Sequence, residues 1–207
     1  MPEIDLRRPK TVAANFLREI DMFFEGRGEV HQTLRRLVRL LEKAKIPYVV
    51  MGGLALPVHG YERMTKDVDV LLTRPGFNEF RRLYVPKYYE PVRGFTRRFV
   101  DRKNQRGIDI LITGLYPGSG KPGPIAFPDP EKVRRQVKSI QYVELVPLVE
   151  LKLAARRHRD FADVVELIRY NNLDESFLDR LHQSVRKDFV ECLEEKRRED
   201  EYMARDD

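Results

Sequence analysis

One short segment constrains the fold of this chain more than any other, namely the run Thr65–Leu72. In its centre the apolar residues Val68 and Val70 alternate with Asp67 and Asp69. Successive side chains of a β-strand point to opposite faces of the sheet, so this alternation predicts a half-buried strand with both carboxylates on one face. Two neighbouring carboxylates repel each other unless a cation lies between them. The segment therefore predicts a sheet with a cation-binding face.

A glycine pair, Gly52 and Gly53, lies between a short β-type run and a short helix predicted over residues 54–59. Glycine lets the backbone approach a ligand closely, and amide groups at a strand-to-helix turn favour a phosphate. A third acid, Asp109, lies in the apolar strand predicted over residues 107–112, where an unpartnered carboxylate would be costly to bury. These features together predict a phosphate cradle beside a group of three acids.

The remaining pattern predicts an α/β (α+β) fold with a small mixed sheet. We expect N-terminal helices over residues 1–45, a sheet domain over 46–144, and a C-terminal helical part with an acidic tail over 145–207. Residues 95–100 and 108–112 predict a hairpin, which would bring the third acid into the same sheet as the first two.

Other elements follow from helical periodicity and from turn residues. We expect helices over residues 11–24, 30–44, 77–84, 145–170 and 177–199. The segment 116–130 contains five prolines and three glycines, so we expect an irregular loop that forms a wall beside the site.

The helix predicted over residues 145–170 has two stripes. The apolar stripe includes His158 and Ala162, so both residues are expected in the core. A polar stripe extends from Lys152 to Asp163, and such a stripe is most often a solvated face. The alternative is that it carries functional groups.

At these residues the chain resembles the DNA polymerase beta-like nucleotidyltransferase superfamily. The pattern of that superfamily is a Gly-Gly or Gly-Ser turn, an Asp-x-Asp pair and a third acid on a neighbouring strand. Within it, the chain looks most like the small bacterial proteins grouped with the AbiEii-type toxin nucleotidyltransferases, on the stretches Gly53–Leu72 and Lys152–Asp163. The resemblance covers roughly residues 45–170.

The resemblance implies a Mg²⁺-dependent enzyme, with Mn²⁺ as an alternative ion, that transfers a nucleotide from a nucleoside triphosphate to an acceptor. It implies Asp67, Asp69 and Asp109 as metal ligands and catalytic groups, and Asp160 or Asp163 as a base or substrate-positioning group. The nucleotide-binding residues that it implies are Gly52, Gly53, Arg63, Thr65 and Lys152.

The acceptor stays open between an RNA such as tRNA, a protein hydroxyl and a small molecule. The chain could be the toxin of a toxin–antitoxin pair with a cognate antitoxin as partner. The segment Arg81–Arg106 has nine bases, two acids and interleaved aromatic residues, which favours an RNA surface. The alternative is that these aromatic residues form core. A second class of function is a non-catalytic module that binds nucleotide, RNA or a partner on the same fold, and the acids could also be structural partners of arginines.

Composition narrows the setting. The single cysteine, Cys192, excludes an internal disulfide framework and a cysteine-rich zinc site. The chain has no apolar run near the length of a membrane span, so we expect a cytoplasmic protein without a membrane partner. The net charge of +6 is unevenly spread, because residues 191–207 have eight acids and four bases and the rest of the chain is therefore more basic.

Overall fold

The computed structural model describes residues 19–206. The strands are β1 (Tyr48–Met51), β2 (Asp67–Leu72), β3 (Tyr89–Pro91), β4 (Arg98–Asp101), β5 (Gly107–Ile112), β6 (Arg134–Val137) and β7 (Ile140–Val143). Within the described residues, these seven strands form one sheet in the order β3-β4-β5-β2-β1-β7-β6. Parallel and antiparallel pairs both occur, which confirms the predicted α/β (α+β) class with a mixed sheet.

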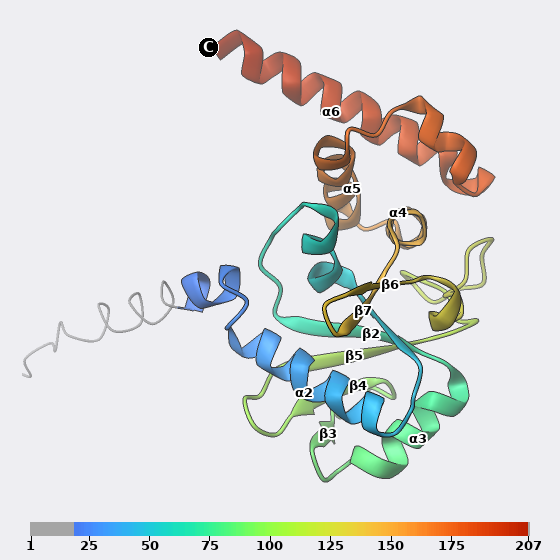
Figure 1. Ribbon diagram of the computed structural model, residues 1–207. Coiled ribbons are helices and arrows are strands. Elements are labelled where there is room, and N and C mark those ends of the chain that lie inside the picture. The colour runs from blue at the N-terminus through green and yellow to red at the C-terminus, as the bar shows by residue number, and fades with distance from the viewer. Residues whose placement is uncertain (1–18, 207) are drawn as a thin grey trace, which may run out of the picture.

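Helices flank the sheet (Figure 1). The α-helices are α2 (Glu29–Lys43), α3 (Arg74–Tyr84), α4 (Leu145–Ala155), α5 (His158–Asn171) and α6 (Arg186–Asp206). The 3-10 helices are η1 (Gly52–Ala55), η2 (Pro57–His59), η3 (Pro130–Lys132), η4 (Glu175–Arg180) and η5 (Gln183–Val185). Residues 19–24 are also helical, and the rest of the helix predicted over 11–24 lies outside the described residues. Over residues 19–206, no helix combines the length and the apolar character that a membrane span needs.

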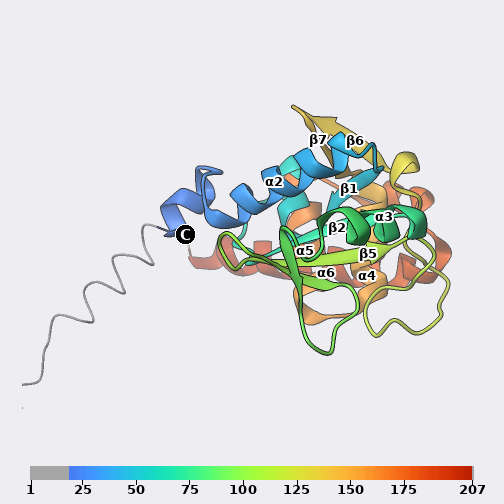
Figure 2. The same cartoon turned by 90° about the horizontal axis from the view of Figure 1, so that it is seen from below.

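The side chains of β2 divide between the two faces of the sheet, as the alternation predicts. Val68 and Val70 are fully buried in a core that α2 and α3 cover, together with Ile108 and Ile110 of β5. Figure 2 shows α2 and α3 lying across this side of the sheet. Leu71, which has the opposite parity, packs in the core on the other side, with residues of α4 and α5. The carboxylates of β2 share the parity of Leu71 and therefore face that second side.

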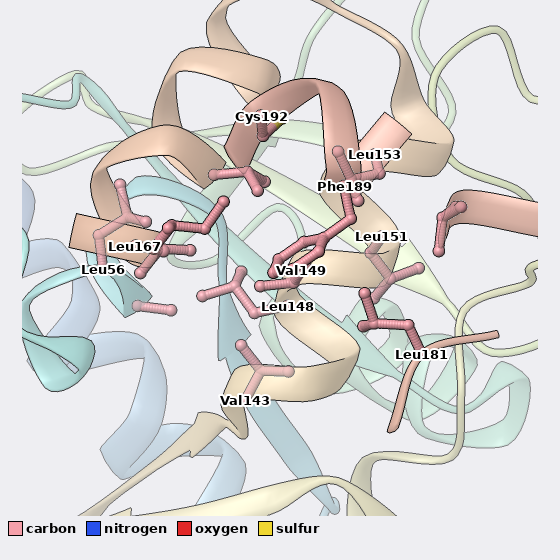
Figure 3. Close-up of a cluster of buried hydrophobic side chains, with 14 of the residues drawn as sticks. Leu56, Val143, Leu148, Val149, Leu151, Leu153, Leu167, Leu181, Phe189 and Cys192 are labelled. Atoms are coloured by element: carbon pink, nitrogen blue, oxygen red, sulfur yellow. The ribbon is translucent and has the colours of Figure 1, made fainter. Parts of the chain in front are cut away.

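The second core joins the sheet to α4, α5 and α6 (Figure 3). Leu148 of α4, Leu167 of α5 and Phe189 of α6 are buried there beside Val143 of β7. Full burial of one such side chain contributes about 1.5–3 kcal/mol. Cys192 is buried in the same cluster. Apolar packing therefore attaches the C-terminal helices to the face of the sheet that carries the acids.

The single helix predicted over residues 145–170 is wrong. Arg156 adopts a left-handed conformation with a φ of 55°, and Arg157 is extended, so α4 ends at Ala155 and α5 begins at His158. The break changes which side of α5 faces the core. His158 is consequently exposed, and its predicted place in the core is also wrong.

The break also changes the status of the polar stripe. Lys152 is 5% exposed and Asp163 is 1% exposed, so the solvated-face interpretation of this stripe is wrong for both residues. Ala162, which was predicted to be buried, is exposed. A helical period counted across the break thus places His158 and Ala162 on the wrong face, whereas Val165 and Ile168 are buried as predicted.

Three further boundaries differ from the prediction. The short helix predicted over residues 54–59 is replaced by η1 and η2. The helix predicted over 177–199 is replaced by η4, η5 and the start of α6, which continues to Asp206. Helix α3 begins earlier than predicted because the Thr73 hydroxyl caps it, accepting a 3.1 Å hydrogen bond from the Gly76 N–H.

The aromatic residues of the basic segment, together with Phe80 directly before it, divide between the two interpretations. Those buried in the core are Phe80, Tyr84, Tyr89 and Phe99. Tyr88 and Phe95 are 40% and 55% exposed. The core interpretation therefore holds for four of these rings. The other two are exposed and are the rings that an RNA could contact.

Candidate active site

Strands β2 and β5 bring the three strand acids together. The two strands are parallel neighbours, and Asp69 lies directly beside Asp109 in the register. Asp67 lies beside Gly107 in the same register. A Cβ on Gly107 would overlap the Asp67 carboxylate, so the absence of a side chain there leaves room for this acid. The predicted placement of all three acids in one sheet is confirmed.

The glycine turn after β1 fits closely around one of these acids. Gly52 has a φ of +63°, which disfavours other residues, and a Cβ on it would overlap the Asp69 carboxylate. A Cβ on Gly53 would lie 2.9 Å from the Cβ of Thr65. The predicted phosphate-binding turn therefore lies against Asp69 and Thr65, and in the structure the room left by Gly52 holds a carboxylate.

The position of Asp69 affects its titration. Desolvation raises the pKa of this carboxyl most, and the neighbouring charges of Asp109 and Asp67 add to the rise, bringing the pKa to about 7. A carboxyl with that pKa is only partly ionised at neutral pH. A bound cation would favour the ionised form, so the charges of the three acids favour the binding of a cation between them.

One basic side chain already contacts this group. Arg98 of β4 lies opposite Asp109 in the antiparallel register. Its Nε donates to Oδ1 of Asp109 and its Nη2 donates to Oδ2, both at 2.6 Å. The guanidinium also lies over the Phe95 ring, 5.1 Å from its centroid. Both oxygens of Asp109 are therefore engaged by one arginine.

A second group of charges lies on α4, α5 and the loop before β2. The Lys152 ammonium is 2.6 Å from Asp163 Oδ2 and 3.5 Å from Asp160 Oδ1. Arg63 donates to both oxygens of Asp163, at 2.5 and 2.7 Å. Arg157 donates to both oxygens of Asp160, at 2.5 and 3.3 Å. We call these five residues the helix cluster, and Asp67, Asp69 and Asp109 the strand acids.

The three basic side chains of the helix cluster outnumber its two acids. Burial acts to raise the pKa of Asp163, but Arg63 and Lys152 outweigh it and hold this pKa below its usual value. Lys152 and Asp160 are 5% and 3% exposed. The helix cluster thus ties the loop at Arg63 to both helices, and each of its two buried acids forms ion pairs with two basic side chains.

A cavity of about 710 Å³ joins the two groups. Asp163, predicted as the alternative to Asp160, does not line it. The other residues predicted for the site do: Gly52, Gly53, Arg63, Thr65, Asp67, Asp69, Asp109, Lys152 and Asp160. The predicted loop wall contributes its segment Tyr116–Gly120. Gly118 in this segment has a φ of +64°, and a Cβ there would lie 2.5 Å from the Ala155 carbonyl oxygen, so the loop packs tightly on the end of α4.

Sequence reasoning gave no site role to Arg157 or Arg98. Arg157 lies in the unpredicted break between α4 and α5, so no helical period could place it. The predicted hairpin could have indicated Arg98 as a neighbour of Asp109. Its turn, however, was expected at residues 103–105, and a turn centred there pairs Asp109 with residue 99, whereas the observed partner is Arg98. A slip of one residue moves a strand's side chains to the other face.

The observed register depends on the contacts of Asp101 with the turn and with α2. The Asp101 carbonyl accepts a 2.8 Å hydrogen bond from the Gln105 N–H, and its carboxylate accepts one of 2.9 Å from the Lys103 N–H. Thr33 and Arg36 of α2 also donate to this buried carboxylate. Contacts with α2 thus fix the turn, and the sequence pattern of the hairpin alone does not reveal these contacts.

The donor set of the strand acids suits a hard divalent cation, because Mg²⁺ prefers carboxylate oxygens. Between residues 19 and 206, no three His, Cys, Asp or Glu side chains converge closely enough to hold a metal ion as they stand. Asp67 and Asp69 take part in no ion pair with the basic residues of the described chain, whereas Asp109 faces Arg98. The residues thus fit a metal at the pair, with the third acid engaged elsewhere.

In comparisons with known proteins, neither a protein-family model nor a curated protein matches the chain. Its function is therefore argued from the geometry and the charges of this cavity.

Proposed function

We propose that the chain is a metal-dependent nucleotidyltransferase that uses a nucleoside triphosphate as donor. The observation that carries the proposal is the meeting of Asp67, Asp69 and Asp109 with the glycine turn in one cavity, beside a helix cluster rich in basic groups. Acids alone would repel a triphosphate. A divalent cation at the acids and basic residues on the facing wall together would attract it.

Asp67 and Asp69 would hold the metal, which would neutralise charge on the triphosphate and align the attack. The raised pKa of Asp69 supports this assignment, because a cation relieves the repulsion that raises it. Asp109, once free of Arg98, would accept the proton of the acceptor hydroxyl. Arg157, whose side chain is 71% exposed, and Lys152 would contribute positive charge to the wall that faces the phosphates.

An RNA is the acceptor class that the surface supports best. Arg97 and Phe95 line the rim of the cavity within the basic segment, and Phe95 is exposed. Exposed rings beside arginines suit unpaired bases and their phosphates. A toxin role with a cognate antitoxin would be one physiological setting for such an activity.

The test is transfer of label from α-³²P-labelled nucleoside triphosphates to total RNA or to lysate protein. Asp67→Asn and Asp69→Asn should each abolish transfer while circular dichroism stays unchanged. Asp179→Asn is the matched control, because this exposed acid lies outside the cavity and loses the same charge. Undiminished transfer in Asp67→Asn would overturn the proposal.

A non-catalytic nucleotide-binding module is the second candidate. The engagement of Asp109 by Arg98 favours it, since the third acid is not free. Titration calorimetry with each triphosphate separates the two candidates when combined with the label assay. Mg²⁺-dependent binding without any transfer would favour the module, and binding with transfer favours the enzyme.

A further inference from the structure

The ion pair between Arg98 and Asp109 bears directly on how many metal ions this cavity holds. The two side chains lie opposite each other on β4 and β5 and form a fork with two hydrogen bonds of 2.6 Å. Such a fork uses both carboxylate oxygens. While the fork persists, both oxygens of Asp109 are occupied by the guanidinium, and its positive charge opposes a metal ion at the same carboxylate.

Arg98 also differs in its surroundings from the other bases of the cavity wall. Lys152, Arg63 and Arg157 each pair with an acid of the helix cluster. Within residues 19–206, Arg98 is the one basic side chain that forms an ion pair with a strand acid. Its positive charge thus stands where a second divalent ion would otherwise neutralise Asp109.

The ion pair between Arg98 and Asp109 is supported by a neighbouring ring, and it is accessible to solvent and to ligands. The Phe95 ring supports the guanidinium from one face, at 5.1 Å from its centroid. The side chains of Arg98 and Asp109 are 43% and 25% exposed. A partly exposed ion pair contributes little to stability, so a phosphate or a metal ion could displace one partner.

We propose that Arg98 is a positioning residue that acts as the resident counter-ion of Asp109, so that the cavity binds one divalent metal at Asp67 and Asp69 and admits a second only when Arg98 leaves Asp109. The inference rests on the proposed function. It adds to that function the claim that the ion pair between Arg98 of β4 and Asp109 of β5 determines how many metal ions the cavity binds. An entering triphosphate offers Arg98 a new anionic partner, and the exchange frees Asp109 at the moment when the substrate is in place.

The test measures Mn²⁺ bound to the nucleotide-free full chain, by the electron paramagnetic resonance signal of the free ion. The unaltered chain should bind one equivalent. Arg98→Gln should bind two, because it keeps a polar side chain but releases Asp109. Arg93→Gln is the matched control, since Arg93 is an exposed arginine between β3 and β4 that does not line the cavity. This variant should bind one equivalent.

A second variant tests the proposal without altering Arg98. Asp109→Asn should still bind one equivalent, because its carboxylate is not a ligand in the resting state. Adding it to Arg98→Gln should reduce two equivalents to one. Two equivalents in the unaltered chain, one in Arg98→Gln, or a lost site in Asp109→Asn would each overturn the inference.

Failure of the proposed function has a different outcome in the same experiment. If the unaltered chain bound no Mn²⁺, or if Asp67→Asn did not weaken binding, the metal site itself would be wrong. If the unaltered chain and Arg98→Gln both bound one equivalent that Asp67→Asn removed, the metal site would stand and only the role of Arg98 would fall.

Discussion

The strand acids and the helix cluster line the same cavity but neutralise their charges in opposite ways. The strand acids have three carboxylates and one basic partner, Arg98. The helix cluster has two carboxylates, Asp160 and Asp163, and three basic partners. One group therefore has an excess of negative charge, and the other has an excess of positive charge.

This difference separates architecture from chemistry. A buried acid that is fully paired holds the elements around it in place, because removing one partner leaves an uncompensated charge. An acid that lacks a partner makes the folded chain less stable until a cation binds. We therefore expect the helix cluster to contribute mainly to stability and the strand acids mainly to ligand binding, and three predictions test this division.

The largest effect is expected for Asp163→Asn. The substitution keeps the shape of the side chain but leaves Lys152 and Arg63 without their shared carboxylate in a buried setting. Breaking a buried ion pair costs about 3–5 kcal/mol, so the free energy of unfolding in urea should fall by that amount. Glu79→Gln is the control, because it breaks the exposed pair with Arg82 and should lower the free energy of unfolding far less. Equal losses in the two variants would contradict a structural role for the helix cluster.

The helix cluster also shows where prediction from sequence ended. Lys152, Asp160 and Asp163 were identified as candidates, but their burial depends on the break at Arg156, which contains no proline or glycine. A left-handed residue of an ordinary type is set by the packing of α4 and α5 on the sheet. Local propensity could not predict it.

The strand acids were more predictable. Alternation in β2 fixed the face of Asp67 and Asp69, and burial of Val68 and Val70 on the other face makes a slip of the register costly. The position of Asp109 followed from the predicted hairpin. The partner of Asp109 did not follow, because contacts with α2 set the hairpin register.

An intermediate effect is expected for Gly52→Ala. A non-glycine residue at a φ of +63° is strained by about 1–2 kcal/mol, and the new Cβ would also displace the Asp69 carboxylate. Gly26→Ala is the matched control, because Gly26 has a φ of +67° and a Cβ there would meet nothing within 4 Å. Both variants should lose the strain energy, but only Gly52→Ala should also weaken Mn²⁺ binding. Equal Mn²⁺ affinity in the two variants would show that Gly52 does not position Asp69.

The smallest effect is a dependence of stability on pH that has opposite signs in the two groups. The pKa of Asp69 is about 7 in the folded chain and about 3.9 when unfolded, so folding favours its protonated form. Its contribution to stability is complete below about pH 4 and is lost as the pH rises through about 7. The pKa of Asp163 is lowered by folding, so its contribution is present above about pH 4 and is lost as the pH falls below that value.

Urea unfolding of the metal-free chain between pH 4 and pH 8 measures this contrast. Asp69→Asn should be more stable than the unaltered chain at pH 8 by about 1–2 kcal/mol, since each pKa unit corresponds to about 1.4 kcal/mol and solvent screens part of the shift. Near pH 4 the two chains should have equal stability, because the carboxyl is then protonated and neutral like the amide. Saturating Mn²⁺ should abolish the advantage at pH 8, since the ion neutralises the same carboxylate. A gain in Asp69→Asn that persisted unchanged at pH 4 would show that repulsion among the strand acids is not its cause.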